Sequence, residues 1–148
     1  FLAGAICRGL FVGVSVSLLV LFFVPIKIYS PVVLIYFSVL SCSFMGLLGL
    51  ISGIWASKFD HIAAITNFIV TPLSLLSGTF YSITILPENF YIISQLNPFF
   101  YMIDGFRFSM IGYADSNIYV GGAILLILNI VLYCITILML KSGFKLKA

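Results

Sequence analysis

Side chains that commonly carry chemistry are scarce in this chain, and the first to consider is its only histidine, His61. It lies beside Lys58 and Asp60 in a short polar turn between two apolar stretches. A serine–histidine dyad would have to use this histidine, and one histidine cannot build a histidine-rich metal site. The sequence also contains no Gly-x-x-x-x-Gly-Lys-Ser/Thr phosphate loop, no His-Glu-x-x-His motif and no Gly-x-Ser-x-Gly elbow. These observations favour a conduit or an anchor over a catalyst, and they predict no metal site.

A second set of polar residues lies inside a strongly apolar stretch. Its members are Asn67, Thr71, Ser74 and Gly78. Their intervals of four, three and four residues place them on one face of a helix. A polar face in a membrane requires another helix, water or a substrate as its partner, so helix packing and the lining of a transport path both remain open. Pro72 should weaken or kink this helix near Phe68, because proline has no N–H for that carbonyl.

The stretch at about residues 86–112 is too apolar for a solvated loop and too polar for a simple membrane span. Pro87 suits the first turn of a helix. That helix should end at Asn97-Pro98, because proline disfavours a helical conformation in the residue before it. Pro98 can then open a second short helix, on which Asp104 and Arg107 are spaced to pair. The pattern predicts a re-entrant or external helical hairpin.

The composition places these residues in a membrane. Of the 148 residues, 63% are hydrophobic and 7% are charged, whereas a soluble domain carries about 25% charged residues. The apolar runs are continuous, which favours helices over a barrel. We therefore predict an all-α membrane protein, one transmembrane domain over 1–148, with four transmembrane helices and the hairpin before the last span. The spans are expected at about 9–26, 32–56, 62–83 and 118–140.

Basic residues predict the orientation of these spans. Four spans place both ends of the chain on one side of the membrane. That side holds five of the seven basic residues, namely Arg8, Lys58, Lys141, Lys145 and Lys147. The positive-inside rule then puts both ends in the cytoplasm and the hairpin outside. The net charge of +3 serves orientation, and no nucleic acid is expected as a partner.

The second predicted span carries small residues at helical spacing. They are Ser38, Cys42, Gly46, Gly49, Gly53 and Ala56. Small residues on one face allow helix backbones to approach closely in lipid. Packing within the chain is one interpretation of this face, and a subunit interface or the lining of a transport path is the other.

The hairpin and the stretch before it resemble a known family. The residues that carry the resemblance are Leu86, Pro87, Asn97, Pro98, Tyr101, Asp104 and Arg107. They are similar to the Leu-Pro, Asn-Pro, Tyr and acid-x-x-Arg pattern in the C-terminal portion of the type-2 family of ABC transporter permeases, the membrane subunits of ABC exporters. The stretch from Thr71 to Tyr81 is similar to the end of that family's fifth span. The resemblance extends over essentially the whole chain and is strongest from about Thr66 to Gly112.

The resemblance implies a six-span permease of the bacterial plasma (inner) membrane. Such a permease works as a dimer, here expected to be a homodimer, together with separate ABC ATPase subunits. The four spans of this chain would be the third to the sixth. Because the chain begins with Phe1 in an apolar run, we expect a fragment without the first two spans and the coupling helix. ATP and Mg would bind to the ATPase subunit, so no cofactor is expected in this chain. Lys58, Asp60 and His61 would lie on the correct side for a secondary ATPase contact.

In this scheme, the polar face of the third predicted span would line the substrate path, and the hairpin would form its exit. Asp104 and Arg107 are expected to fix the hairpin structurally rather than to bind substrate. The competing interpretation is a non-transporting membrane anchor or assembly subunit surrounded by lipid. The polar face and the broken hairpin argue against it, because a plain anchor needs neither.

Overall fold

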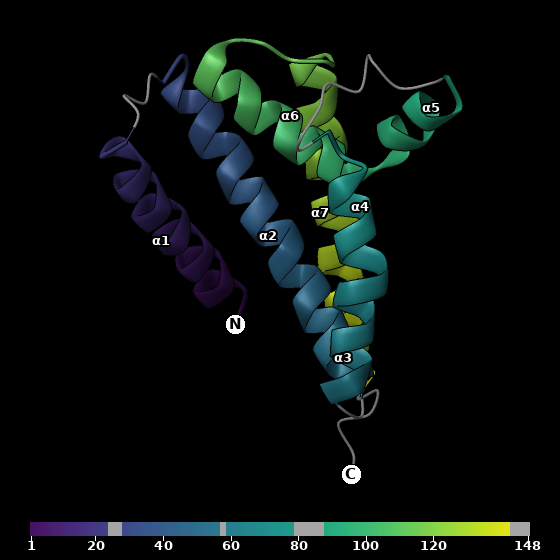
Figure 1. The fold of residues 1–148 in the computed structure, drawn as a ribbon. Coiled ribbons are helices and arrows are strands. Elements are labelled where there is room, and N and C mark those ends of the chain that lie inside the picture. The colour runs from purple at the N-terminus through teal and green to yellow at the C-terminus, as the bar shows by residue number, and fades with distance from the viewer. Residues whose placement is uncertain (24–27, 57–58, 79–87, 143–148) are drawn as a thin grey trace.

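The computed structural model describes residues 1–23, 28–56, 59–78 and 88–142, and every regular element in these ranges is helical. The elements, shown in Figure 1, are α1 (Leu2–Leu21), α2 (Pro31–Trp55), α3 (Phe59–Ile65), the π-helix η1 (Thr66–Val70), α4 (Thr71–Leu75), α5 (Glu88–Leu96), α6 (Pro98–Ile111) and α7 (Ile118–Lys141). The expected all-helical class is confirmed for this part of the chain.

Three of these helices are long and apolar enough to cross a membrane. They are α1, α2 and α7, with 20, 25 and 24 residues. Helices α2 and α7 agree within one residue with the ranges 32–56 and 118–140 predicted from hydropathy. Many large apolar side chains on them face outward, which is the arrangement that lipid as solvent requires.

The first helix begins earlier than its predicted range of 9–26. It starts at Leu2, and Arg8 lies inside it with an exposed side chain instead of marking its start. One arginine does not end a helix, because its backbone keeps its hydrogen bonds while the long side chain carries the charge outward. The helix ends at Leu21, and residues 24–27 lie outside the described residues.

The third predicted span, 62–83, is not one regular helix. Elements α3, η1 and α4 follow one another without a break and form one rod in Figure 1. Thr71 donates both its backbone N–H and its hydroxyl to the carbonyl five residues earlier, the hydroxyl at 3.0 Å. Because Pro72 offers no N–H to the carbonyl of Phe68, the ordinary helical pattern cannot continue there. The disturbance predicted near Phe68 therefore takes the form of a π-helical turn. Residues 79–87, which include the end of this predicted span, lie outside the described residues.

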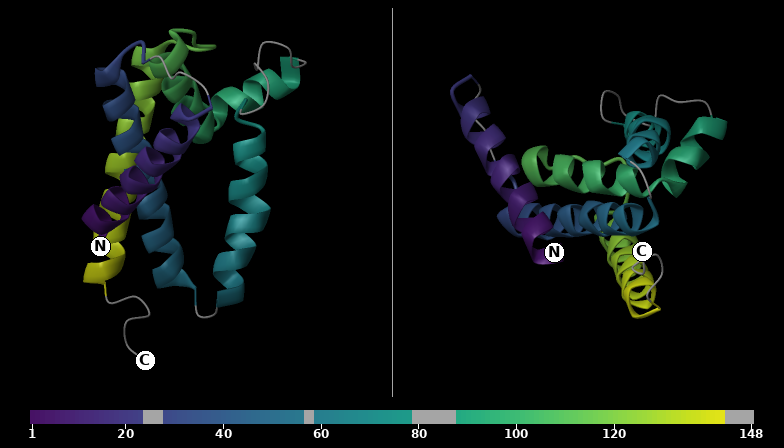
Figure 2. Two further views of the ribbon diagram at one scale, coloured as in Figure 1. Left: turned by 60° about the vertical axis from the view of Figure 1, so that its left-hand side comes forward. Right: turned by 90° about the horizontal axis from the view of Figure 1, so that it is seen from below.

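The hydrophobic core lies where α6 packs against α2 and α7. Its buried side chains are Phe37, Phe44, Phe99, Met102 and Leu125. The rings of Phe44 and Phe99 meet edge to face, with 6.1 Å between their centroids. Figure 2 shows α6 beside α2 near one end of the long helices, so this short helix is part of the packed bundle.

Close packing of α6 depends on glycine at two positions. A Cβ atom at residue 105 would overlap the ring of Phe37, so only glycine allows α6 to approach α2 this closely. A Cβ atom at residue 121 of α7 would stand 2.9 Å from Cδ1 of Tyr101. Tyr101, one of the residues in the resemblance, therefore packs over a glycine of the last long helix.

The predicted boundaries of the second hairpin helix agree with the structure. Asn97 separates α5 from α6, and its side-chain oxygen accepts a hydrogen bond from the N–H of Phe99 at 3.0 Å. Pro98 occupies the first helical position, where its missing N–H costs nothing. Gly112 ends α6 in a left-handed conformation with φ of 73°, which glycine adopts without steric cost.

The short helices α5 and α6 lie toward one end of the long helices. Figure 1 shows the end of α2, the start of α3 and the end of α7 at one end of the long helices, with α5 and α6 toward the other. The backbone N–H groups of Tyr29 and Ser30 donate to the carbonyl of Ser109 and thereby join the start of α2 to α6.

The small-residue face of α2 packs in part against α1. A Cβ at Gly9 of α1 would stand 2.7 Å from the sulfur of Cys42, and one at Gly46 would stand 3.0 Å from Cβ of Ala5. Packing within the chain thus explains the part of this face at Cys42 and Gly46. The lower positions, Gly49 and Gly53, have no atom of the described residues within 4 Å of such a Cβ. A subunit interface or the lining of a transport path therefore remains open for Gly49 and Gly53.

Candidate functional site

Three carbonyl groups at and after the end of α4 are bound by side chains of the hairpin. The final carbonyls of a helix have no partner in their own helix and need donors from elsewhere. Here the donors are side chains on or between α5 and α6. We call this set the hairpin junction; it comprises the carbonyls of Leu73, Leu76 and Gly78 and the side chains of Asn97, Ser94 and Arg107.

Asn97 lies at the centre of the hairpin junction and is 3% exposed. Its Nδ2 donates to the carbonyl of Leu73 at 2.5 Å, while its Oδ1 caps α6. One buried side chain therefore sets the start of α6 and fixes that start to α4. Ser94 adds a second bond, from its hydroxyl to the carbonyl of Leu76 at 3.0 Å.

Arg107 makes the charged contact of the hairpin junction. One guanidinium nitrogen donates to a carboxylate oxygen of Asp115 at 2.9 Å, and the other donates to the carbonyl of Gly78. The predicted pair with Asp104 is present only at 4.0 Å. The closer partner of Arg107 is thus Asp115, in the turn before α7.

Asp104 is buried, with 1% of its surface exposed, and its carboxylate holds the turn between α6 and α7. It accepts from the backbone N–H groups of Asp115 and Ser116 at 2.8 and 2.9 Å, and from the hydroxyl of Ser116 at 2.6 Å. Hydrogen bonds to an ionised carboxylate are stronger than neutral ones, so this turn is firmly attached to α6. Asp104 and Arg107 together join three segments: α4, α6 and the turn.

Sequence reasoning missed three members of this network: Ser94, Asp115 and Ser116. Asp115 and Ser116 belong to a polar turn that reads as an ordinary loop, because side chains such as these are common in turns. Ser94 resembles any other serine of an apolar helix. Leu86 and Pro87, which carry part of the resemblance, lie outside the described residues.

The four polar residues of the third predicted span have different environments. Asn67 and Thr71 are exposed, Ser74 is half-buried and Gly78 is buried. Gly78 has φ of 77°, which glycine adopts without steric cost, and its carbonyl accepts a hydrogen bond from Arg107. This residue therefore belongs to the hairpin junction. The hydroxyl of Ser74 donates to the carbonyl of Thr71 at 2.9 Å.

At the opposite end of the rod, α3 carries Asp60 and His61 of the predicted ATPase contact. His61 and Asp60 are exposed, and the ring of His61 lies 5.8 Å from that of Trp55 between centroids. Lys58 lies outside the described residues. Within the described ranges, no three His, Cys, Asp or Glu side chains group closely enough to hold a metal ion.

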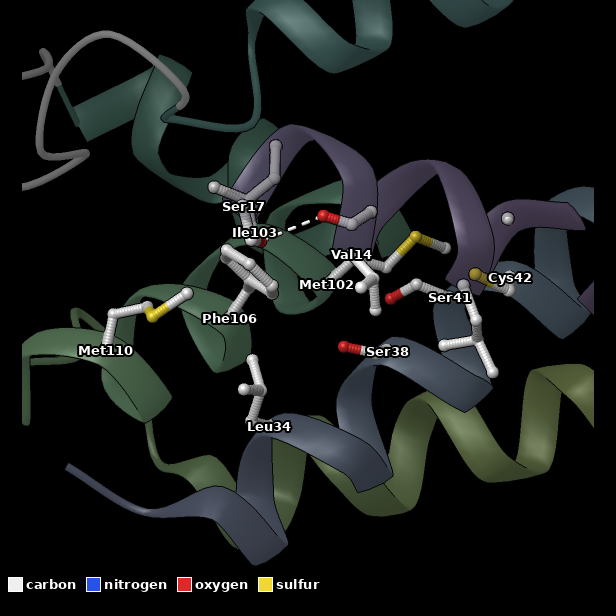
Figure 3. A pocket seen from close by; sticks show the side chains of 13 residues that line it. Val14, Ser17, Leu34, Ser38, Ser41, Cys42, Met102, Ile103, Phe106 and Met110 are labelled. Atoms are coloured by element: carbon white, nitrogen blue, oxygen red, sulfur yellow. Dashed lines mark hydrogen bonds between the residues drawn. The ribbon is translucent and has the colours of Figure 1, made fainter. Parts of the chain in front are cut away.

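A pocket of about 550 Å³ lies between α1, α2 and α6. Figure 3 shows Val14 and Ser17 of α1, Ser38 of α2, and Met102 and Phe106 of α6 around it. Its lining is almost wholly apolar, and the hydroxyl of Ser17 donates to a carbonyl of its own helix. No lining residue comes from α3, η1 or α4, so the pocket is separate from the polar face of the rod.

The described residues define a helical protein with three candidate membrane spans, in which Ser94 of α5 and Asn97 before α6 bind to the end of the rod formed by α3, η1 and α4. Comparison with known families gives its identity at the family level. Residues 1–111 match the family described as ABC-2 type transporter. The chain belongs to this family of membrane transport permeases, as the residues of the hairpin predict.

The chain is similar to curated proteins from enteric bacteria. It is 37% identical over 143 residues to the inner membrane transport permease YadH of Escherichia coli K12, and equally to the proteins of that name in Escherichia coli O157:H7 and Shigella flexneri. The match covers 97% of this chain and 56% of each relative. The chain thus spans about half the length of these relatives. No solved structure matches it.

Proposed function

We propose that this chain is part of the membrane subunit of an ATP-driven exporter in a bacterial inner membrane. Two permease copies, expected to be identical, form the path, and separate ABC ATPase subunits bind and hydrolyse ATP. Membership of the ABC-2 type family and the similarity to an inner membrane transport permease support this proposal. Both ends of the chain then lie in the cytoplasm, and the hairpin lies outside.

The rod formed by α3, η1 and α4 acts as the fourth span of this proposal. Its elements of seven, five and five residues would extend about 25 Å at roughly 1.5 Å per residue. That length approaches the hydrocarbon thickness of about 30 Å. A π-turn inside a helix often marks a functional position, and this one brings the exposed Asn67 and Thr71 to its surface.

The hairpin junction is the observation that carries the mechanism. Its three side-chain-to-carbonyl bonds and the Arg107–Asp115 pair connect the rod to α6 and to the turn before α7. A displacement of the rod, started at Asp60 and His61 by ATPase closure, is thereby transmitted to the hairpin. The polar face lines the path and the hairpin forms its exit.

The first test uses the full-length gene product, gently solubilised from its native membrane and analysed for copurifying proteins by mass spectrometry. We expect an ABC ATPase subunit in near-equal amount. Recovery of intact permease without an ATPase, even after crosslinking in the membrane, would contradict the proposal and favour an anchor or assembly subunit.

A second test addresses the path. We expect Thr71→Leu to reduce efflux of whichever substrate the wild-type complex exports, with assembly intact, because leucine removes a hydroxyl from the exposed face. Ser15→Leu is the matched control, since the hydroxyl of Ser15 is also exposed and bonded to its own helix, but lies on α1. Equal efflux by the two variants would remove the path-lining role from Thr71.

A further inference from the structure

The pocket between α1, α2 and α6 has walls but no side chain that fills it. Its volume of about 550 Å³ lies within the range of about 300–1,000 Å³ that small-molecule sites occupy. Packed interiors leave few voids larger than a water molecule, and the side chains around an empty space lose their dispersion contacts. The pocket is partly open at the molecular surface, and its almost wholly apolar lining suits an apolar occupant.

The helices that line the pocket indicate that its opening faces lipid. Two of them, α1 and α2, are candidate membrane spans. Helix α1 has no buried residue, and among the elements that the structure describes it packs only against α2. On α1 the lining runs from Gly9 to Ser17, and on α2 it runs from Leu34 to Cys42. Each stretch advances about 12 Å along its helix, which is somewhat less than half of the hydrocarbon thickness of about 30 Å. The pocket is thus no longer than one leaflet is thick.

The end of the molecule carrying α6 has the features of a membrane–water interface. Three exposed tyrosines flank elements there: Tyr29 before α2, Tyr113 after α6 and Tyr119 in the first turn of α7. Tyrosine is enriched at the headgroup level of a bilayer. The pocket begins beside Met110 and Leu34, just below this level, and continues toward the bilayer centre. A lipid with its headgroup among the tyrosines would have its acyl chain at the pocket.

We propose that the pocket between α1, α2 and α6 binds one acyl chain of a membrane lipid from the leaflet on the hairpin side. The chain fills the space beside Gly13 and Ser38, and it supplies α1 with contacts that α2 alone does not provide. This inference depends only on the membrane location of α1 and α2, so it stands or falls independently of ATP-driven export.

The test uses the full-length permease in bilayer nanodiscs of phosphatidylethanolamine. The probe is a phosphatidylcholine that carries a diazirine near the end of one acyl chain. After irradiation, mass spectrometry locates the lipid adducts. We expect adducts concentrated on residues 9–17, 34–42 and 102–110.

Two variants fill the pocket without disturbing the fold. A Cβ at Gly13 meets no atom within 4 Å, so Gly13→Leu places its side chain in open space. Ser38→Leu fills the pocket from the α2 side. Gly4→Leu is the matched control, since a Cβ at Gly4 also meets nothing within 4 Å and Gly4 does not line the pocket.

Both filling variants should lower adduct formation at the pocket several-fold, and Gly4→Leu should leave it unchanged. Unchanged adducts in the filling variants, or adducts spread evenly over all outward faces, would show ordinary surrounding lipid and overturn the proposal. Absence of lipid adducts at the pocket, with a photoreactive residue at position 38 crosslinking to a protein segment, would also overturn it.

Discussion

Replacing Asn97 with alanine tests whether the hairpin junction contributes to stability beyond ordinary helix capping. The substitution removes two bonds at once: the cap on the N–H of Phe99 and the donor to the carbonyl of Leu73. Loss of a side-chain cap costs about 1 kcal/mol. A buried carbonyl left without a donor costs about 1–3 kcal/mol more. We therefore expect Asn97→Ala to lower the free energy of unfolding by about 2–4 kcal/mol.

The chain supplies a matched control in Asn117, which caps α7. Its Oδ1 accepts from the N–H of Tyr119 at 3.0 Å, and its side chain is exposed. Asn117→Ala should therefore cost only the capping contribution of about 1 kcal/mol. Asn97→Asp gives a second comparison, because it keeps the cap acceptor but has no N–H for Leu73.

The assay is reversible denaturation of the purified full-length permease in mixed micelles, followed by tryptophan fluorescence and circular dichroism. The difference between Asn97→Ala and Asn117→Ala isolates the contact with α4. Equal losses in the two variants would refute the reasoning, since they would show that Asn97 acts only as a cap. Full stability of Asn97→Asp would refute it as well.

Two further predictions use the same denaturation assay. Gly105→Ala should lower the free energy of unfolding by about 1–3 kcal/mol, because its Cβ would overlap the ring of Phe37. Adding Phe37→Leu should restore part of this stability. If Gly105→Ala left the stability unchanged, that result would contradict the close approach of α6 and α2. Asp115→Ala should lower the free energy of unfolding by about 3–5 kcal/mol, because it leaves the largely buried charge of Arg107 without its nearest carboxylate. A loss no larger than that from removing a surface capping residue would show that the pair does not contribute to stability.

The sequence by itself determined the membrane class, two of the long helices and the bounds of α6, the second helix of the predicted hairpin. These features depend on local causes: continuous apolar runs, the proline after Asn97 and the glycine that ends α6. The π-turn is also local, because the missing N–H of Pro72 affects a carbonyl only four residues away. The start of α1 was mispredicted because a charge was taken as a boundary, although Arg8 is compatible with a continuing helix.

The tertiary structure alone decided which groups meet. Arg107 is spaced to pair with Asp104 on its own helix, yet it bonds more closely to Asp115 because the turn after α6 folds back over it. Gly105 is required by a ring on α2, 68 positions away in the sequence. The pocket likewise exists only because three separate helices leave a space between them. Such contacts join segments distant along the chain, and the spacing of residues within one segment carries no record of them.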